Sequence, residues 1–431
     1  MWFIDTTYAN IIRVINMKQI YTALEINERE IRILIGEYFN TRFNIIKLET
    51  VAIDGVEDFK IVNHEKVKNA ITKLVSEASS MLGATIERVI LLIPSYNFKR
   101  YPLKVSVKTK NGIVSKNDVA RAISKAMHTK VDNDVMIINA VCVKYTVNGI
   151  SSRRLPEREA SDELIVDIDL LCADKVLTFD YVSILEECGV EIMDICLDIY
   201  AIGKEAALFE QTLNQNIVLL RTDDNTTEMA ILSKGKLINS DVVFKGLDSI
   251  IDEVYAKYHI PYQTIRRLVK YNTIYTDQCL DDAIYAWNDE QGNPQSMTER
   301  DLRDVVYKPL SEYVETLATS LQPILDSFTT SIVVVGEMAS MEAFVKMLEE
   351  RCKVAVKSYF PETIGVRDSS LTALYGSLFA YHDMANIKDV KNSSINLLEF
   401  ENIVDHKVGD VEGESLTGKI KNLFEMNKRE K

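Results

Sequence analysis

The chain has 431 residues, of which 47% are hydrophobic and 26% are charged. These values are typical of a folded protein with two domains or more and exclude a largely disordered chain. The formal net charge of -14 argues against a general nucleic-acid binder, because the phosphates would be repelled. Six scattered cysteines and five histidines predict reduced core thiols and no metal site. No apolar run reaches the ~20 residues that span a bilayer, so any membrane contact is expected to be peripheral.

Residues 1–16 are mildly apolar but have neither the basic start nor the cleavage site of a signal peptide. We interpret them as an N-terminal extension. The pattern that organises the chain follows: an apolar run, a polar corner and a second apolar run. It occurs over residues 20–37 and again over residues 217–238. Each copy predicts a hairpin, and Gly235 supplies the positive φ for the next turn. Two copies predict two related halves.

The first half continues with a strand, a helix and a strand, over residues 43–53, 64–82 and 88–93. The helix expected next arrives only at residues 175–187, before a strand at residues 191–195. The stretch between them predicts an inserted β-rich subdomain, with strands at 101–108, 136–147 and 163–171, a helix at 116–128 and a loop at 148–161.

The second half predicts a helix over residues 198–208 that crosses between the halves. Further helices are predicted over residues 247–258 and 261–268, and over residues 296–328 as one long helix or two in series. Pro309 and Pro323 are expected to kink or break the last of these.

This order of elements resembles the actin-like ATPase superfamily, an α/β fold of two duplicated RNase H-like halves. The position of the insert resembles FtsA, the bacterial cell-division protein, and its relative PilM of type IV pili. Short phrases similar to FtsA lie at residues 23–26, 33–37, 185–190, 227–231, 332–336 and 371–376. The resemblance implies a first half (17–94, 174–205 and 365–383), an inserted subdomain (95–173), a second half (206–245 and 329–364) and a helical subdomain (246–328).

The two polar corners are where the resemblance implies that ATP and magnesium bind. Their residues depart from the family, which has Gly and hydroxyl residues in the first corner, and an Asp and a Gly run in the second. The candidate cleft residues are Glu25, Asn27, Glu28, Arg221, Asp223, Asp224, Asn225, Gly336 and Glu337. Carboxylates that converge on a polyphosphate repel it, at roughly 4 kcal/mol for a contact at ~4 Å. We expect a degenerate, non-catalytic cleft that an Arg221–carboxylate pair holds shut. The alternative is that magnesium neutralises some of the acids.

The resemblance implies that the helical subdomain receives the acidic C-terminal tail of FtsZ. Arg300, Arg303 and Lys308 are the candidate contacts, and Arg266, Arg267 and Lys270 add positive charge nearby. The alternative reading of both groups is a solvated helical face. Leu310 stands where many FtsA sequences have an arginine. Either Lys308 takes over that contact or the position of the contact has changed.

Residues 384–414 are polar and acidic and predict a flexible linker. Residues 415–431 then predict a cationic amphipathic helix that lies on a membrane surface. Its candidate lipid contacts are Leu416, Lys419, Ile420, Lys421, Leu423, Phe424, Lys428 and Arg429. The alternative is a helix that docks on its own globular body.

The resemblance therefore implies a structural adaptor on the cytoplasmic side of the cell membrane, at the division site. Its expected partners are FtsZ, further copies of itself in an actin-like filament, inner-membrane lipids, and later division proteins through the insert. No nucleic acid is expected. The alternatives are a PilM-like adaptor of pilus assembly, which would not be expected to carry the linker and tail, and an actin-like or DnaK-like ATPase, which would need intact phosphate corners.

Overall fold

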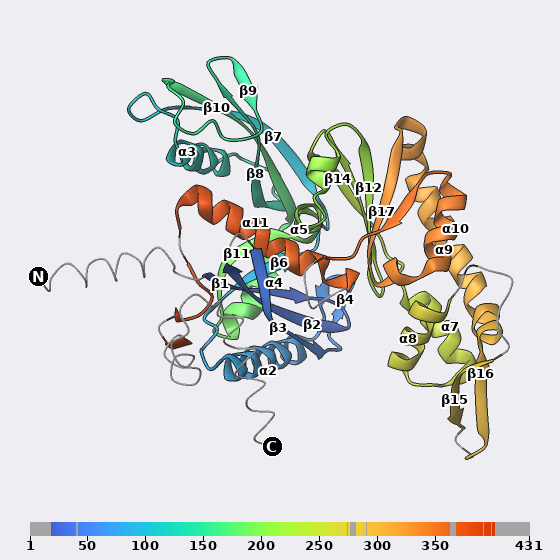
Figure 1. Cartoon of the computed structure of the whole chain (residues 1–431). Helices are drawn as coiled ribbons and strands as arrows, with labels where there is room; N and C mark the ends of the chain where they lie inside the picture. Colours follow the sequence, from blue (N-terminus) through green and yellow to red (C-terminus); the bar gives the residue numbers. More distant parts are fainter. Residues whose placement is uncertain are drawn as a thin grey trace, which may run out of the picture.

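The computed structural model describes residues 19–39, 42–273, 275, 282–289, 291–362, 368–390, 392–397 and 399–400. Its larger sheets are two of five strands and one of four strands (Figure 1). The predicted N-terminal extension (1–16) and the predicted amphipathic helix (415–431) lie outside the described residues. In the described part of the chain, no helix is both long and apolar enough to cross a bilayer.

The first five-stranded sheet contains the first predicted hairpin. Its order is β11–β6–β1–β2–β3, with strands β1 (Gln19–Ile26), β2 (Glu30–Phe39), β3 (Arg42–Ala52), β6 (Arg88–Ile93) and β11 (Glu191–Leu197). β1, β2 and β3 are antiparallel neighbours, whereas β6 runs parallel to β1, and β11 runs parallel to β6. This sheet is the core of what we call the first half.

Helices cover both faces of the first sheet, and Figure 1 shows α2 and α11 on opposite sides of it. After the short strands β4 (Val56–Glu57) and β5 (Lys60–Ile61), α2 spans His64–Leu82, as predicted. It starts at Asn63, whose side chain accepts a hydrogen bond from the Lys66 N–H, and ends at Gly83, whose φ is 74°. Its buried apolar residues recur at helical spacing. α4 (Lys175–Glu187) packs beside α2.

On the other face, α5 (Asp198–Glu205) packs against α11 (Thr372–Lys388). The two helices approach most closely at Gly376, where a Cβ atom would lie 1.8 Å from the carbonyl oxygen of Ala201. Glycine therefore sets the distance between these helices. The short helix α6 (Leu208–Gln211) follows α5, and the short helix η2 (Ser369–Leu371) precedes α11.

The start of the predicted flexible linker packs on the first half, so the linker prediction is wrong for its first residues. α11 continues to Lys388, and Ser394, Ile395 and Phe400 are buried. The N–H of Ser394 donates to the carbonyl of Ile20, and the Ser394 Oγ accepts from the N–H of Thr22, both at 2.8 Å. Two apolar side chains and these hydrogen bonds outweigh the polar composition of the segment. The remainder of the predicted linker, residues 401–414, lies outside the described residues.

The predicted insert forms a sheet with its own hydrophobic core. The sheet order is β7–β10–β8–β9, with strands β7 (Lys99–Lys108), β8 (Val135–Val147), β9 (Ile150–Ser152) and β10 (Glu163–Asp174). α3 (Lys116–Met127) packs on it and starts with a capping box between Ser115 and Asp118. The short strand β9 falls inside the predicted loop 148–161. Figure 1 shows the insert above the first sheet.

The second five-stranded sheet repeats the arrangement of the first. Its order is β14–β13–β12–β17–β18, with strands β12 (Asn216–Thr222), β13 (Thr227–Ser233), β14 (Lys236–Val243), β17 (Thr330–Gly336) and β18 (Val356–Ser358). β12 is antiparallel to β13 and parallel to β17, as β1 is to β2 and β6. Lys234 and Gly235, at φ 51° and 70°, make the predicted tight turn. With η1 (Glu337–Ser340) and α10 (Glu342–Cys352), this sheet forms the second half.

A mostly helical part extends from the second half and shares its core. It contains α7 (Asp248–Tyr258), α8 (Tyr262–Asn272) and α9 (Glu299–Ser327). Pro309 and Pro323 both lie inside the continuous α9, so neither breaks it. A hairpin of β15 (Ala283–Asn288) and β16 (Pro294–Thr298), which the sequence reading did not predict, precedes α9.

Candidate functional site

The two predicted corners face each other across a cleft between the halves. Each corner is a tight turn: the N–H of Asn27 donates to the carbonyl of Glu30, and the N–H of Asp223 donates to the carbonyl of Thr226, both at 2.9 Å. These two N–H groups are therefore already used. The cavity between the corners is lined by Glu25, Ile26, Asn27, Glu28, Arg32, Val56, Phe59, Leu92, Ile93, Pro94, Tyr181, Asp198, Arg221, Asp223, Asp224, Thr226 and Glu228.

Six of the nine predicted cleft residues line this cavity, namely Glu25, Asn27, Glu28, Arg221, Asp223 and Asp224. Asn225 is half-buried at the tip of the second corner. Gly336 and Glu337 lie at the end of β17 and belong to a neighbouring cluster described below. The sequence reading missed Arg32, Asp198 and Glu228, which are also buried here.

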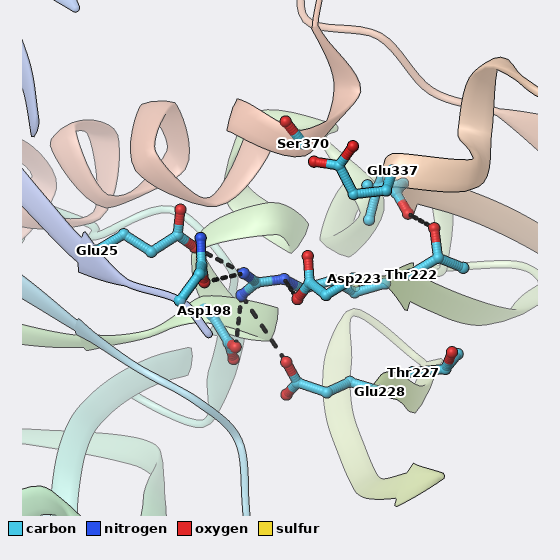
Figure 2. Close-up of polar contacts among 12 residues, drawn as sticks. Glu25, Asp198, Thr222, Asp223, Thr227, Glu228, Glu337 and Ser370 are labelled. Carbon is cyan, nitrogen blue, oxygen red and sulfur yellow. Dashed lines mark hydrogen bonds and ion pairs between the residues drawn. The ribbon is translucent and has the colours of Figure 1, made fainter. Parts of the chain in front are cut away.

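Arg221 is the centre of the cleft. It is the last but one residue of β12, is only 4% exposed, and is surrounded by carboxylates from both halves. Its Nη2 lies 2.6 Å from Glu25, its Nη1 lies 2.6 Å from Asp198, and its Nε lies 2.9 Å from Asp223. Glu228 is the fourth partner, at 3.8 Å. Figure 2 shows Glu25, Asp198 and Glu228 directed at this centre from separate elements. The expected Arg221–carboxylate pair is therefore present, and it bridges the halves.

Burial shifts the protonation of this cluster. It raises the pKa of Glu228 well above its ordinary value, and the neighbouring charge of Asp198 raises it further. Burial also raises the pKa of Asp223 to about 6, although Arg221 opposes the shift, and it raises the pKa of Glu28. Burial by itself lowers the pKa of Arg221, but Asp223 and the other carboxylates raise it far above its usual range. Burial thus favours the neutral form of these acids, whereas their charges favour the protonated form of Arg221.

A second buried cluster surrounds Glu337, which follows β17. Its carboxylate contacts Arg32 of β2 at 3.0 Å, and Arg266 and Lys270 of α8 at 2.7 and 2.8 Å. Burial opposes ionisation, but Arg266, Lys270 and Arg32 together hold the pKa of Glu337 far below its ordinary value. Arg266 also pairs with Asp224, which links this cluster to the second corner.

Gly336 allows the chain to turn into this cluster. Its φ is 93°, and a Cβ atom would lie 2.2 Å from the carbonyl oxygen of Thr222. Its N–H donates to the Oγ of Ser369, and the N–H of Met338 donates to the Oγ1 of Thr222, both at 3.0 Å. The backbone that carries Glu337 is therefore fixed on both sides.

Two further contacts join the halves around the cleft. Arg29, at the first corner, donates its Nε to Asp248 of α7 at 2.9 Å. At the rim, the rings of Phe59, Tyr96 and Phe244 form a triangle, with centroids 6.0 to 6.2 Å apart. Phe59 belongs to the first half, Tyr96 lies between β6 and strand β7 of the insert, and Phe244 follows β14 of the second half. Ion pairs thus join the two halves in the interior of their interface, and an aromatic cluster joins them at its edge.

The residues of the cleft do not fit a triphosphate. The space left for water-sized molecules between the corners is about 20 Å³, room for roughly one water molecule. Both oxygens of Glu28, one of Glu25 and one of Glu228 are buried without a hydrogen-bond partner among the described residues. A phosphate placed there would meet these carboxylate oxygens as well as the unpaired Nδ2 of Asn27, and the two arginines that line the cavity, Arg221 and Arg32, already bind carboxylates. Among the described residues, no group of three or more His, Cys, Asp or Glu side chains is arranged to hold a metal ion.

The predicted partner residues separate into two groups. Arg266 and Lys270 are not available to an external partner, because they bind Glu337. The interpretation of these two residues as positive charge for the FtsZ tail was therefore wrong. Arg300 and Lys308 are exposed on α9, and the guanidinium of Arg303 lies 5.7 Å from the ring of Tyr307. Lys308 lines a groove of about 440 Å³ between α7 and α9 and lies 4.0 Å from Glu312. Leu310 is a core residue.

The chain is similar to Cell division protein FtsA of Bacillus subtilis, with 23% identity over 358 residues, which are 82% of this chain and 81% of that protein. The predicted resemblance to FtsA is confirmed. No protein-family model matches the chain.

Solved structures support the fold. The PilM–PilN type IV pilus biogenesis complex matches with a TM-score of 0.54 at 11% identity, over 84% of this chain and 98% of that one. MreB5 of Spiroplasma citri bound to ADP matches with a TM-score of 0.50 at 13% identity, over 86% of this chain and 99% of that one. At these identities the likeness shows the fold alone, and the predicted actin-like fold is confirmed.

Proposed function

We propose that this protein is a cell-division adaptor of the FtsA type whose two halves are joined by its own side chains instead of by ATP. The observation that carries the second part is the position of Arg221, buried among Glu25, Asp198 and Asp223 in the cleft. The similarity to FtsA over most of the chain supports the division role.

The cleft residues support a protein that does not use ATP. A nucleotide would have to displace an arginine with three close carboxylate partners and separate the halves that it joins. Ligand pockets commonly have volumes of roughly 300–1,000 Å³, far above the space between these corners. In this proposal the protein is a pseudo-ATPase, and its assembly depends on partners and on the membrane.

The proposed partners are those of an FtsA-type adaptor. The exposed Arg300, Arg303 and Lys308 region of α9 would receive the acidic tail of FtsZ, and residues 415–431 would bind inner-membrane lipids at the division site. Other division proteins would bind the insert. A groove of about 660 Å³ between β8 of the insert and the helices α5, α6 and α11 supports this. Arg153 and Arg154 line it, and Lys204 pairs there with Asp383.

Calorimetric titration of the full chain with ATP and magnesium tests the nucleotide part of the proposal. We expect no measurable heat of binding up to millimolar ATP. A dissociation constant in the micromolar range would contradict this part of the proposal and favour a protein whose polymerisation depends on ATP. Titration of the same sample with a peptide of the FtsZ tail tests the adaptor role and also shows that the protein is competent to bind. An Arg303→Glu and Lys308→Glu double variant is the matched control and should lose the peptide.

A further inference from the structure

The carboxylate of Glu337 is bound in the way that proteins bind a free anion. Three cationic side chains contact it, and they come from two separate elements, β2 and α8. Arg32 approaches one oxygen, while Arg266 and Lys270 approach the other. The side chain is 3% exposed. Charge-assisted hydrogen bonds of this kind are among the strong ones in proteins.

The three cations differ in how far other acids neutralise them. Arg32 also lies 2.5 Å from Glu30 and 3.5 Å from Glu25, and it donates to the carbonyl of Ser370. Arg266 shares Asp224. For Lys270, Glu337 is the single ion-pair partner found in the described part of the chain. Without the Glu337 carboxylate, at least one buried cation would be left uncompensated.

We propose that Glu337 is a built-in anionic ligand, whose carboxylate fills an oxyanion site made by Arg32, Arg266 and Lys270 and thereby ties the first half to the second. The proposal rests on the function proposed above, in which no nucleotide joins the halves. It adds that the chain supplies the anion itself and that the site accepts a tetrahedral oxyanion such as inorganic phosphate once the side chain is removed.

The surrounding backbone agrees with this role. Gly336 and Met338 lie on either side of Glu337, and the N–H of each is hydrogen-bonded. Gly336 donates to Ser369, in the segment before α11, and Met338 donates to Thr222 of the second half. The backbone that carries the carboxylate is therefore fixed on both sides in the joined molecule, which lowers the entropic cost of the contact. Arg32 reaches it from β2 of the first half, so the contact forms only when the halves are together.

The test is rescue of a Glu337→Ala variant by inorganic phosphate. In chloride the melting temperature of the variant should fall by several degrees, because three buried cations lose a partner. In phosphate at the same ionic strength it should recover, with a saturable dependence on phosphate concentration. Phosphate stabilises many proteins in a general way, so the gain is compared with that of the wild type and of Glu315→Ala. Glu315 is the matched control, because it pairs with the exposed Arg351 at 2.5 Å.

Further variants separate a real site from a general salt effect. Adding Lys270→Ala to Glu337→Ala should weaken the apparent phosphate affinity by roughly 10- to 100-fold, since one charged hydrogen bond is lost. Glu337→Gln should lose stability without phosphate rescue, because the amide still fills the space. If Glu337→Ala is insoluble in chloride, refolding in phosphate should recover soluble protein.

A phosphate gain no larger than that of the wild type and Glu315→Ala, or an equal gain in the Lys270→Ala double variant, would overturn the proposal. Failure to refold in phosphate would do the same. These outcomes are independent of the ATP titration of the wild type. That titration tests only the nucleotide part of the proposed function and does not test the Glu337 site.

Discussion

At the scale of single residues, the cleft contains buried charges that stabilise the protein only when all of them are present to compensate one another. Arg221 compensates several acids, and each acid is also constrained by burial. Removing one partner of a buried pair costs more than the pair contributes, because the remaining charge is left without compensation. This asymmetry makes the cleft sensitive to single substitutions.

We predict that Arg221→Ala lowers the free energy of unfolding by about 3–5 kcal/mol, because Glu25 and Asp198 lose their close cationic partner. Denaturant unfolding measures the change. Arg351→Ala is the control, because it removes an exposed pair with Glu315 and should cost less than about 1 kcal/mol. Equal losses in the two variants would show that Arg221 has no special role.

The protonation of Asp224 gives a second prediction. Burial raises its pKa to about 7 in the folded protein, against an ordinary value near 3.8, although Arg266 opposes the shift. A raised folded pKa contributes stability at low pH that is lost as the pH rises through the folded pKa. Between pH 5 and 7.5 this share of the stability should fall by on the order of 2 kcal/mol. Asp224→Asn should remove that share, and urea unfolding of both proteins at the two pH values checks it. An unchanged pH dependence would contradict the assignment.

At the scale of elements, most helices and strands of the two halves could be predicted from the sequence. α2 was predictable because its apolar spacing and both of its caps are local. The hairpin of β15 and β16 was missed, because its exposed strands alternate weakly and carry Trp287 and Tyr285 among polar residues. The first residues after α11 looked like a linker, because two apolar side chains in a polar segment do not reveal what they pack on.

The site was predictable only in part, for a related reason. The corners could be found from their position between apolar runs, and the unusual Arg221 from its place in the second corner. The roles of Arg32, Asp198 and Lys270 could not be found, because their contacts cross large separations in the chain. The predicted helix over residues 261–268 included Arg266 but ended before Lys270. It did not show that Glu337 faces both side chains, so two buried charges were interpreted as part of a partner surface or of a solvated face.

Gly376 gives a prediction about two packed helices. An added Cβ would meet the Ala201 carbonyl at 1.8 Å, so Gly376→Ala must push α11 away from α5. Overpacking of a core typically costs about 1–3 kcal/mol, and more where backbone has to move. Thermal unfolding should show a clear loss. Ser377→Ala is the control, because it removes only a hydroxyl that donates within its own helix. A Gly376→Ala protein as stable as this control would contradict the close approach.

The C-terminal segment, residues 415–431, keeps its prediction as a membrane helix. Leu423→Glu with Phe424→Glu would put two charges on the predicted apolar stripe and should abolish binding to anionic liposomes in co-sedimentation. Gly418→Glu with Asn422→Glu adds the same charge to the opposite side of the predicted helix. That control should retain much more binding. If both double variants still pellet like the wild type, the segment is not the lipid contact.

At the scale of the whole molecule, the insert is a separable unit joined to the first half at adjacent points. The N–H of Asp174 donates to the carbonyl of Tyr96 at 3.0 Å, so the chain enters and leaves the insert side by side. Ser95 has to stay, because its hydroxyl donates to Asp198 and its N–H to Glu228. A deletion of residues 99–172 closed with a short glycine linker respects both facts.

The resemblance to FtsA also implies that the insert contacts the neighbouring copy in a filament. We therefore predict that this deletion leaves a folded core but prevents self-assembly. Electron microscopy on lipid monolayers checks assembly, and circular dichroism checks that the core is folded. Filaments formed by the folded deletion protein would show that the contact lies elsewhere.

The unpredicted hairpin has a practical consequence for following this molecule in solution. The chain has two tryptophans, and Trp287 of β15 stacks on Tyr285 with ring centroids 5.6 Å apart and meets the edge of Tyr258 of α7. Trp2 lies outside the described residues, so a Trp2→Phe protein would have a single tryptophan, Trp287 in the hairpin before α9. Its fluorescence would report on the helical part, where the FtsZ tail is proposed to bind.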